Sequence, residues 1–189
     1  ITSGLKPHEL IILAARPGMG KTAFALNLAT NIAMSGKTVA LFNMEMSAEQ
    51  LVMRMLASVG QIEGGKLKSG NLKNEDWKRV NEAISRLADT KMYIDDTSGM
   101  TISEIRAKCR RLASMKDGLD VIIIDYLQLI QGSDRYKGNR VQEVTEISRN
   151  LKTLGKSVFS AHLRASSLFF DFSETAYPPP YQAWISFLF

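Results

Sequence analysis

The stretch LIILAARPGMGKT, residues 10–22, is a short apolar run that leads into a glycine-rich turn and then a Lys-Thr pair. The apolar run predicts a buried strand. Residues 21–35 then predict a helix with Phe24, Leu28 and Ile32 on one face. A strand, a glycine-rich turn and a helix in this order are typical of a P-loop, whose backbone N–H groups surround the phosphates of a nucleotide.

The turn matches the P-loop pattern except that Ala15 stands where the pattern begins with glycine. Gly18 and Gly20 supply the backbone freedom and close approach that a phosphate cradle requires. Lys21 is predicted to place its charge on the β- and γ-phosphates, as a catalytic residue, and Thr22 to offer its hydroxyl to Mg²⁺. The residues expected to contact the nucleotide are Ala15, Arg16, Pro17, Gly18, Met19, Gly20, Lys21, Thr22 and Ala23.

Strands and helices alternate along the rest of this region, which predicts an α/β fold with a mainly parallel sheet flanked by helices. Ser47 with Gln50, and Thr101 with Glu104, are capping boxes that open two of the helices. Further strands are expected at 38–44, 92–95 and 121–125, helices at 47–59, 74–89, 101–115 and 141–154, and a loop with one helical turn at 60–73.

The apolar stripes of two helices predict which side chains face inward. The first stripe is made of Leu51, Val52, Met55, Leu56 and Val59, and the second of Trp77, Val80, Ile84 and Leu87.

Two acids end predicted strands, where ligands of parallel sheets bind. Asp125 ends the apolar strand 121–125 and is predicted to lie on the magnesium side of the nucleotide. Glu45 ends the second strand of the chain. A carboxylate there is suited to activating the water that attacks the γ-phosphate, but it is equally suited to opening the helix at Ser47, and spacing alone leaves both roles open.

Length and composition limit the number of domains and the kinds of partner that this chain can have. The 189 residues suit one domain, and the net charge of +5 permits an anionic partner without establishing one. Arg135, Lys137 and Arg140, in and beside the polar loop 132–139, are candidates for DNA phosphates, although their charge pattern alone favours a solvated loop.

The single cysteine, Cys109, excludes an intramolecular disulfide and favours an intracellular setting. It is in line with Ile102 and Ile105 at helical spacing, which predicts a buried apolar role. Because no signal peptide and no apolar run of about 18 residues is present, we expect a cytoplasmic location and no membrane partner. The first residue, Ile1, is not a methionine, and we expect a fragment or a processed product.

The composition changes after Lys156. Only three charged residues follow, and six of the eight phenylalanines lie there. Residues 157–161 predict at most a weak strand, and the strand–helix alternation is lost. We expect residues 157–189 to form an aberrant aromatic and proline-containing tail that packs poorly against the core at 1–156.

Four segments together resemble the RecA-like motor domain of DnaB-type replicative helicases. They are the P-loop region 5–28, the segment Asn43-Met44-Glu45-Met46-Ser47 with Gln50-Leu51 and Arg54, the Walker B segment 122–130, and the helix at 139–152. The resemblance runs from the first residue to about Lys156 and is more specific than a P-loop alone.

The resemblance implies a RecA-like core that binds ATP and Mg²⁺. It assigns phosphate and magnesium contacts to Lys21 and Thr22, the magnesium side to Asp125, water activation to Glu45 and a channel-facing position to the loop 131–140. It also implies a homohexameric ring that moves on single-stranded DNA at the nucleoid, with primase and helicase-loader contacts through regions that are partly absent here.

The chain departs from the family at both ends. We expect the family's N-terminal domain to be missing before Ile1, and its γ-phosphate-sensing Gln, DNA-binding loop and arginine finger are not recognisable after Lys156, where His162 is a weak substitute for the sensor. The motor is therefore expected to be incomplete. A nucleotide-binding remnant without turnover is the alternative, and another RecA-type ATPase the second, although the segment 125–129 argues against the latter.

Overall fold

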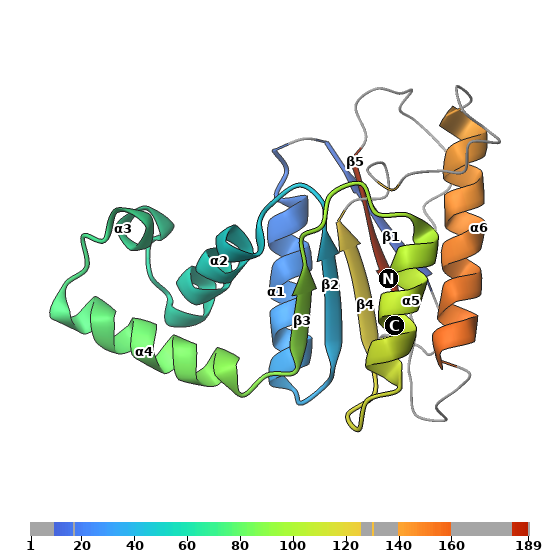
Figure 1. Ribbon diagram of the computed structural model, residues 1–189. Coiled ribbons are helices and arrows are strands. Elements are labelled where there is room, and N and C mark those ends of the chain that lie inside the picture. Colours follow the sequence, from blue (N-terminus) through green and yellow to red (C-terminus); the bar gives the residue numbers. More distant parts are fainter. Residues whose placement is uncertain (1–9, 17, 126–129, 131–139, 160–182, 189) are drawn as a thin grey trace.

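A computed structural model describes residues 10–16, 18–125, 130, 140–159 and 183–188 (Figure 1). The elements in chain order are β1 (Leu10–Ala15), α1 (Lys21–Met34), β2 (Val39–Asn43), α2 (Ala48–Gly60), α3 (Gly64–Ser69), α4 (Asn74–Ala88), β3 (Met92–Asp95), α5 (Ile102–Ala113), β4 (Val121–Asp125), α6 (Arg140–Phe159) and β5 (Ala183–Leu188). The elements expected up to α6 are present with small shifts at their ends. No helix in the described ranges has the length and apolar character needed to cross a membrane.

The described strands form one sheet in the order β1-β5-β4-β2-β3. β2 runs parallel to both β3 and β4, whereas β5 is antiparallel to β1 on one side and to β4 on the other. Since β1 and β4 are both antiparallel to β5, they share one direction with β2 and β3. The expected mainly parallel sheet with flanking helices is confirmed.

Both faces of the sheet are buried at β2 and β4, which explains the nearly continuous apolar sequence of these two strands. Because side chains alternate along a strand, Val39 and Leu41 of β2 join the core beneath α1 and α2. Ala40 and Phe42 join the core beneath α5 and α6. Figure 1 shows α1 on one side of the sheet and α5 and α6 on the other.

The buried face of α1 differs from the predicted one. Phe24 is 57 % exposed, and the helix instead buries Ala25, Ala29 and Ala33. Small side chains let the helix axis lie close to the sheet, so that Leu28 and Ile32 pack from its flanks. The expectation that Phe24 shares the inward face with Leu28 and Ile32 was therefore wrong.

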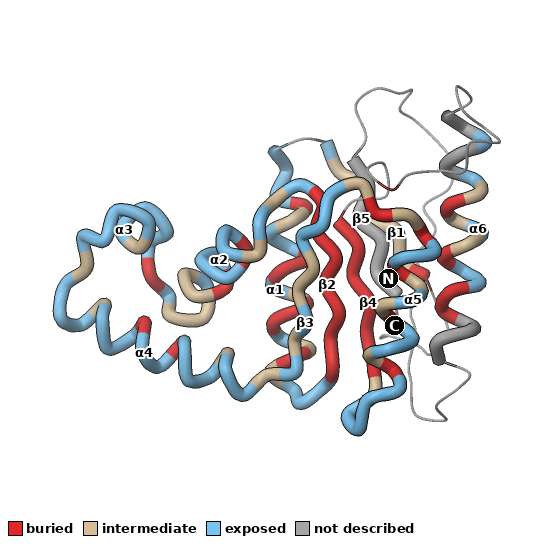
Figure 2. The backbone as a smooth tube through the Cα atoms, in the orientation of Figure 1, coloured by how far each residue is buried: buried red, intermediate tan, exposed pale blue. Residues whose placement is uncertain are grey.

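The helices α2, α3 and α4 form an arm that extends away from the sheet (Figures 1 and 2). On α4, Val80 and Ala83 are buried, but Trp77 is 51 % and Ile84 is 47 % exposed. Their prediction as inward-facing was wrong because, among the described elements, α4 packs mainly against α2 and only a narrow stripe is covered. The stripe of α2 is likewise confirmed only in part: Leu51 and Met55 are buried, whereas Val52 is exposed.

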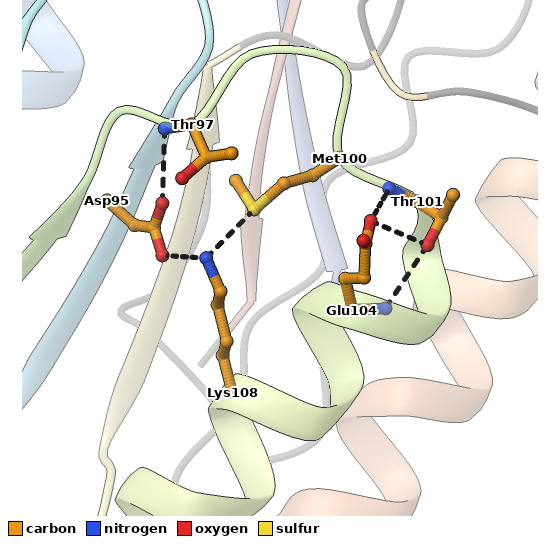
Figure 3. A network of polar contacts seen from close by, with 6 residues as sticks. All are labelled: Asp95, Thr97, Met100, Thr101, Glu104 and Lys108. Atoms are coloured by element: carbon orange, nitrogen blue, oxygen red, sulfur yellow. Dashed lines mark hydrogen bonds and ion pairs between the residues drawn. The ribbon is translucent and has the colours of Figure 1, made fainter.

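Both predicted capping boxes are present. The Ser47 side chain accepts from the Gln50 N–H at the start of α2, and Thr101 accepts from the Glu104 N–H at the start of α5. Figure 3 shows the second box beside a network in which Lys108 donates to Asp95 and to the Met100 sulfur. This network ties the carboxyl end of β3 to α5, and Cys109 on the same helix is buried as predicted.

The C-terminal region differs from expectation in two respects. Residues 157–159 continue α6 as a helix, so no strand begins at Ser157. Residues 183–188 form β5, which lies inside the described sheet between β1 and β4. Residues 160–182 lie outside the described residues, and the division of the chain near residue 156 stays a prediction.

Candidate nucleotide-binding site

The loop between β1 and α1 has the backbone that its glycines predicted. Gly18 and Gly20 have φ angles of 80° and 82°, in the left-handed region that favours glycine. No atom of the described residues lies within 4 Å of a Cβ built at either position, so the backbone conformation is what requires glycine in the protein alone. Gly20 caps α1 without a side-chain hydrogen bond. The first-turn N–H groups, which lack partners within a helix, thus suit an anion.

Lys21, the first residue of α1, lies at the carboxyl end of β4. Its ammonium is 3.6 Å from Oδ1 of Asp125, and the two side chains are 8 % and 1 % exposed. Burial lowers the pKa of Lys21, and the carboxylates of Asp125 and Glu45 oppose that shift. The structure therefore brings the P-loop lysine and the strand-end acid together.

Asp125 is buried at the end of β4, and its two oxygens have different surroundings. Oδ2 accepts a hydrogen bond from Nδ2 of Asn43 at 3.0 Å. Oδ1 is buried and accepts no hydrogen bond from any described residue. A buried carboxylate oxygen left without a hydrogen-bond donor fits a site for Mg²⁺, which prefers oxygen ligands. Thr22 follows Lys21 in the first turn of α1 and is half-buried.

Glu45 follows β2 and is exposed. Its negative charge opposes the lowering of the Lys21 pKa by burial. The N–H groups of Glu45 and Met46 both donate to Oδ1 of Asn43, at 3.0 and 2.7 Å. The turn after β2 is thus fixed by the side chain of the strand's last residue.

Asn43 belongs to the segment 43–47 that carries the family resemblance, but nothing in the sequence alone assigned it a role at this site. It is 1 % exposed and pairs in register with Asp125 across the adjacent strands β2 and β4. The signal in the sequence was an amide that closes an otherwise apolar strand. Strand order decides whether such a residue meets Asp125, and strand order is not local information.

Several predicted site residues are not placed. Pro17, Arg135 and Lys137 lie outside the described residues, as does His162. Arg140 is the first residue of α6, and its side chain is not described. Their expected contacts with nucleotide or DNA stay predictions.

A glycine-rich loop between a strand and a helix, with its lysine against an acid that ends another strand of the same sheet running in the same direction, is the arrangement of a P-loop nucleotide-binding site on a RecA-like core. Residues 1–168 match the family model described as the DnaB-like helicase C terminal domain. The chain belongs to this family.

Two curated relatives are similar to this chain in sequence. The chain is 55 % identical over 159 residues to the replicative DNA helicase DnaC of Bacillus subtilis (strain 168), covering 84 % of this chain and 35 % of that protein. It is 54 % identical over 159 residues to the replicative DNA helicase DnaB of Geobacillus stearothermophilus, with the same coverage. The chain thus spans about a third of the length of these curated relatives.

Two solved structures share the fold. A DnaB-like replicative helicase, described with its interactions with primase, superposes with a TM-score of 0.77 at 32 % identity, covering 82 % of this chain and 37 % of that one. A second solved structure, described as an ATPase domain, gives a TM-score of 0.71 at 32 % identity, covering 75 % of this chain and 51 % of that one.

Proposed function

We propose that this chain is the ATP-binding and ATP-hydrolysing part of a replicative DNA helicase motor. The observation that carries the proposal is the approach of Lys21 to Asp125, 3.6 Å apart, at the end of a β-strand and beside a loop with left-handed glycines. That arrangement suits the binding of a phosphate group that contacts both the lysine and a metal ion. The family assignment favours the helicase motor over another RecA-type ATPase.

Roles for the site residues follow from their chemistry. Lys21 and the amides of residues 15–23 bind the triphosphate, and Lys21 stabilises charge on the phosphoryl group. Thr22 and Asp125 hold Mg²⁺, which neutralises phosphate charge when bound. Glu45 accepts a proton from the attacking water.

The assembly and partners are part of the same proposal. The structural relative described with primase, and the replicative helicases among the sequence relatives, support a homohexamer that acts on single-stranded DNA in the cytoplasm, at the nucleoid. Primase and a helicase loader are the proposed protein partners. Arg135, Lys137 and Arg140 are the proposed DNA contacts, because cations on a loop suit phosphates.

ATP-dependent thermal stabilisation tests the nucleotide site. A ligand that binds only the folded chain stabilises it by about 2.7 kcal/mol at a concentration 100 times Kd. For a chain of this size that is a rise in Tm of roughly 5–10 °C. Lys21→Ala should abolish the rise, whereas Lys78→Ala, which removes an exposed lysine of α4, should keep it. The assignment fails if the Lys21 variant responds to MgATP as the wild type does.

Turnover separates a motor from a nucleotide-binding remnant. ATP hydrolysis should be measured across protein concentrations and with added single-stranded DNA, in this chain and in one extended to the length of the relatives. DNA-stimulated hydrolysis by the longer chain supports the motor. Stoichiometric binding without turnover in both chains would establish the remnant instead.

A further inference from the structure

The amide of Asn43 touches both halves of the candidate site. We propose that Asn43 is a positioning residue that orients the Asp125 carboxylate for the metal ion and holds the turn that presents Glu45. The inference rests on the proposed nucleotide and metal site and adds a residue to it.

The donor side of the amide fixes Asp125. Nδ2 of Asn43 donates to Oδ2 at 3.0 Å, and both residues are 1 % exposed. With Oδ2 engaged, the carboxylate cannot rotate freely. Its other oxygen, Oδ1, stays 3.6 Å from the Lys21 ammonium. Oδ2 is thereby held by the Asn43 amide, while Oδ1, which faces the Lys21 ammonium but accepts no hydrogen bond from a described residue, is the oxygen proposed for the metal ion.

The acceptor side fixes the turn after β2. Oδ1 of Asn43 accepts from the N–H groups of Glu45 at 3.0 Å and Met46 at 2.7 Å, a local arrangement that asparagine favours. The N–H of Met44 meanwhile donates to the backbone carbonyl of Asp125 at 2.9 Å. The chain therefore leaves the sheet at Glu45 in a fixed direction.

A neutral amide can serve both sides at once, because it carries a donor group and an acceptor group. Two N–H donors face one end of the side chain and a carboxylate faces the other, which determines how the amide is oriented. A carboxylate at this position would have no hydrogen to give Asp125, and an apolar side chain would satisfy neither neighbour. A serine hydroxyl can donate once and accept from the local backbone, so it should replace part of the function.

The consequence is a specific effect on metal-dependent binding. Groups that orient a metal's ligands typically contribute 10–100-fold in metal affinity. Phosphate binding without metal depends on the P-loop amides and Lys21, whereas the hydrogen bonds of the Asn43 side chain go to Asp125, Glu45 and Met46. Loss of the amide should therefore weaken binding of ATP with Mg²⁺ and leave binding of ATP in EDTA unchanged.

The experiment compares the affinity for fluorescent mant-ATP in excess Mg²⁺ with that in EDTA, using the 189-residue chain. The ratio of the two affinities is the readout, and a merely structural defect would lower both. The variants are Asn43→Leu and Asn43→Ser. The matched control is Asn81→Leu, at an exposed asparagine of α4. Urea unfolding without nucleotide shows whether each variant folds.

We expect Asn43→Leu to lower the affinity ratio by about 10–100-fold, Asn43→Ser to lower it less, and the control to leave it unchanged. A wild-type ratio in both Asn43 variants overturns the inference, as does a loss that is equal in Mg²⁺ and EDTA. Should Asn43→Leu fail to fold, the Asn43→Ser ratio decides in the same way. If the wild type itself does not bind mant-ATP, the proposed function fails instead, which is a distinguishable result.

Discussion

Glu45 stands two residues beyond the amide that binds Asp125, exposed at the end of β2. Glu45→Gln keeps the size and the local backbone hydrogen bond but removes the carboxylate that is proposed to accept the proton. In a chain extended to the length of the relatives, ATP affinity should stay near the wild-type value. ATP turnover should fall by roughly 10²–10⁴-fold, the usual contribution of a general base.

A matched control separates this role from a general effect of charge. Glu49→Gln removes an exposed carboxylate in the first turn of α2, four residues further on, and should leave turnover unchanged. Steady-state hydrolysis and equilibrium ATP binding are the two measurements. A fall in turnover of less than about tenfold would make Glu45 an ordinary acid at the start of a helix rather than the base.

Among single residues, the sequence could single out those whose place in the candidate site follows from local spacing. Lys21 directly follows its loop and Asp125 ends its strand, so the sequence alone could single them out, and their roles stay predictions. Glu45 was left with two roles because its distance from Lys21 depends on strand order. Asn43 was passed over for the same reason, since its partner lies 82 positions away in the chain.

At the scale of elements, the junction between β3 and α5 is held by one carboxylate (Figure 3). Asp95 accepts from the Thr97 N–H at 3.1 Å and from the Lys108 ammonium. Partial burial alone would raise the pKa of Asp95, but these hydrogen bonds and the charge of Lys108 outweigh it and lower the pKa. The carboxylate is therefore more stable in the folded chain than in the unfolded one.

This lowered pKa predicts an acid-dependent stability. A carboxyl whose folded pKa is depressed stabilises the fold above its unfolded pKa, near 4, and loses that contribution as pH falls through its lower folded pKa. Asp95→Asn should lower the free energy of unfolding by up to about 1 kcal/mol at pH 7. The effect is this small because the side chains of Asp95 and Lys108 are 25 % and 41 % exposed, so that solvent screens their ion pair.

Urea unfolding of wild type and Asp95→Asn at pH 7 and near pH 3 measures this difference. The difference in free energy of unfolding between wild type and Asp95→Asn should be smaller at the lower pH, since the Asp95 carboxylate of the wild type becomes protonated there. Glu82→Gln, at an exposed acid of α4, serves as the control and should show no such gap. A gap of the same size at both pH values would assign the effect to the shape of the side chain rather than to its charge.

Helix ends were predicted well from the sequence, whereas helix faces were predicted only in part: Cys109 of α5 is buried as expected, but Phe24 of α1 is exposed. The Ser47 and Thr101 capping boxes involve residues three positions apart, so the chain alone specifies them. Which apolar side chains are buried depends on what packs against the helix. Trp77 and Ile84 stay exposed because only a narrow stripe of α4 is covered by another described element, mainly α2.

At the scale of the whole molecule, the sheet joins the two ends of the described chain. β5 lies between β1, which leads into the P-loop, and β4, which carries Asp125. Alternating strands and helices predicted the parallel strands, because each follows the previous one through a helix. The antiparallel β5 follows no such pattern. Its partners lie far away in sequence, and its place in the order was not predictable from local composition.

The position of β5 between β1 and β4 predicts the effect of removing it. A chain that ends at residue 182 lacks the strand that pairs Leu10–Ala15 on one side and residues 122–125 on the other. The described sheet would then be divided between β1 and β4, and the spacing of Lys21 from Asp125 would lose its support. The free energy of unfolding should fall by more than the roughly 0.5–3 kcal/mol typical of a single substitution. The MgATP-dependent rise in Tm should shrink with it.

A chain that lacks only Phe189 controls for the loss of the C-terminal residue, because it keeps β5 whole. Urea unfolding gives the stability, and thermal unfolding with and without MgATP gives the response of the site. The truncation should reduce both together, since β1 and β4 are the strands that bring the phosphate loop and Asp125 to one edge. A truncated chain with a wild-type urea midpoint and a wild-type MgATP response would show that β1 and β4 keep their places without β5.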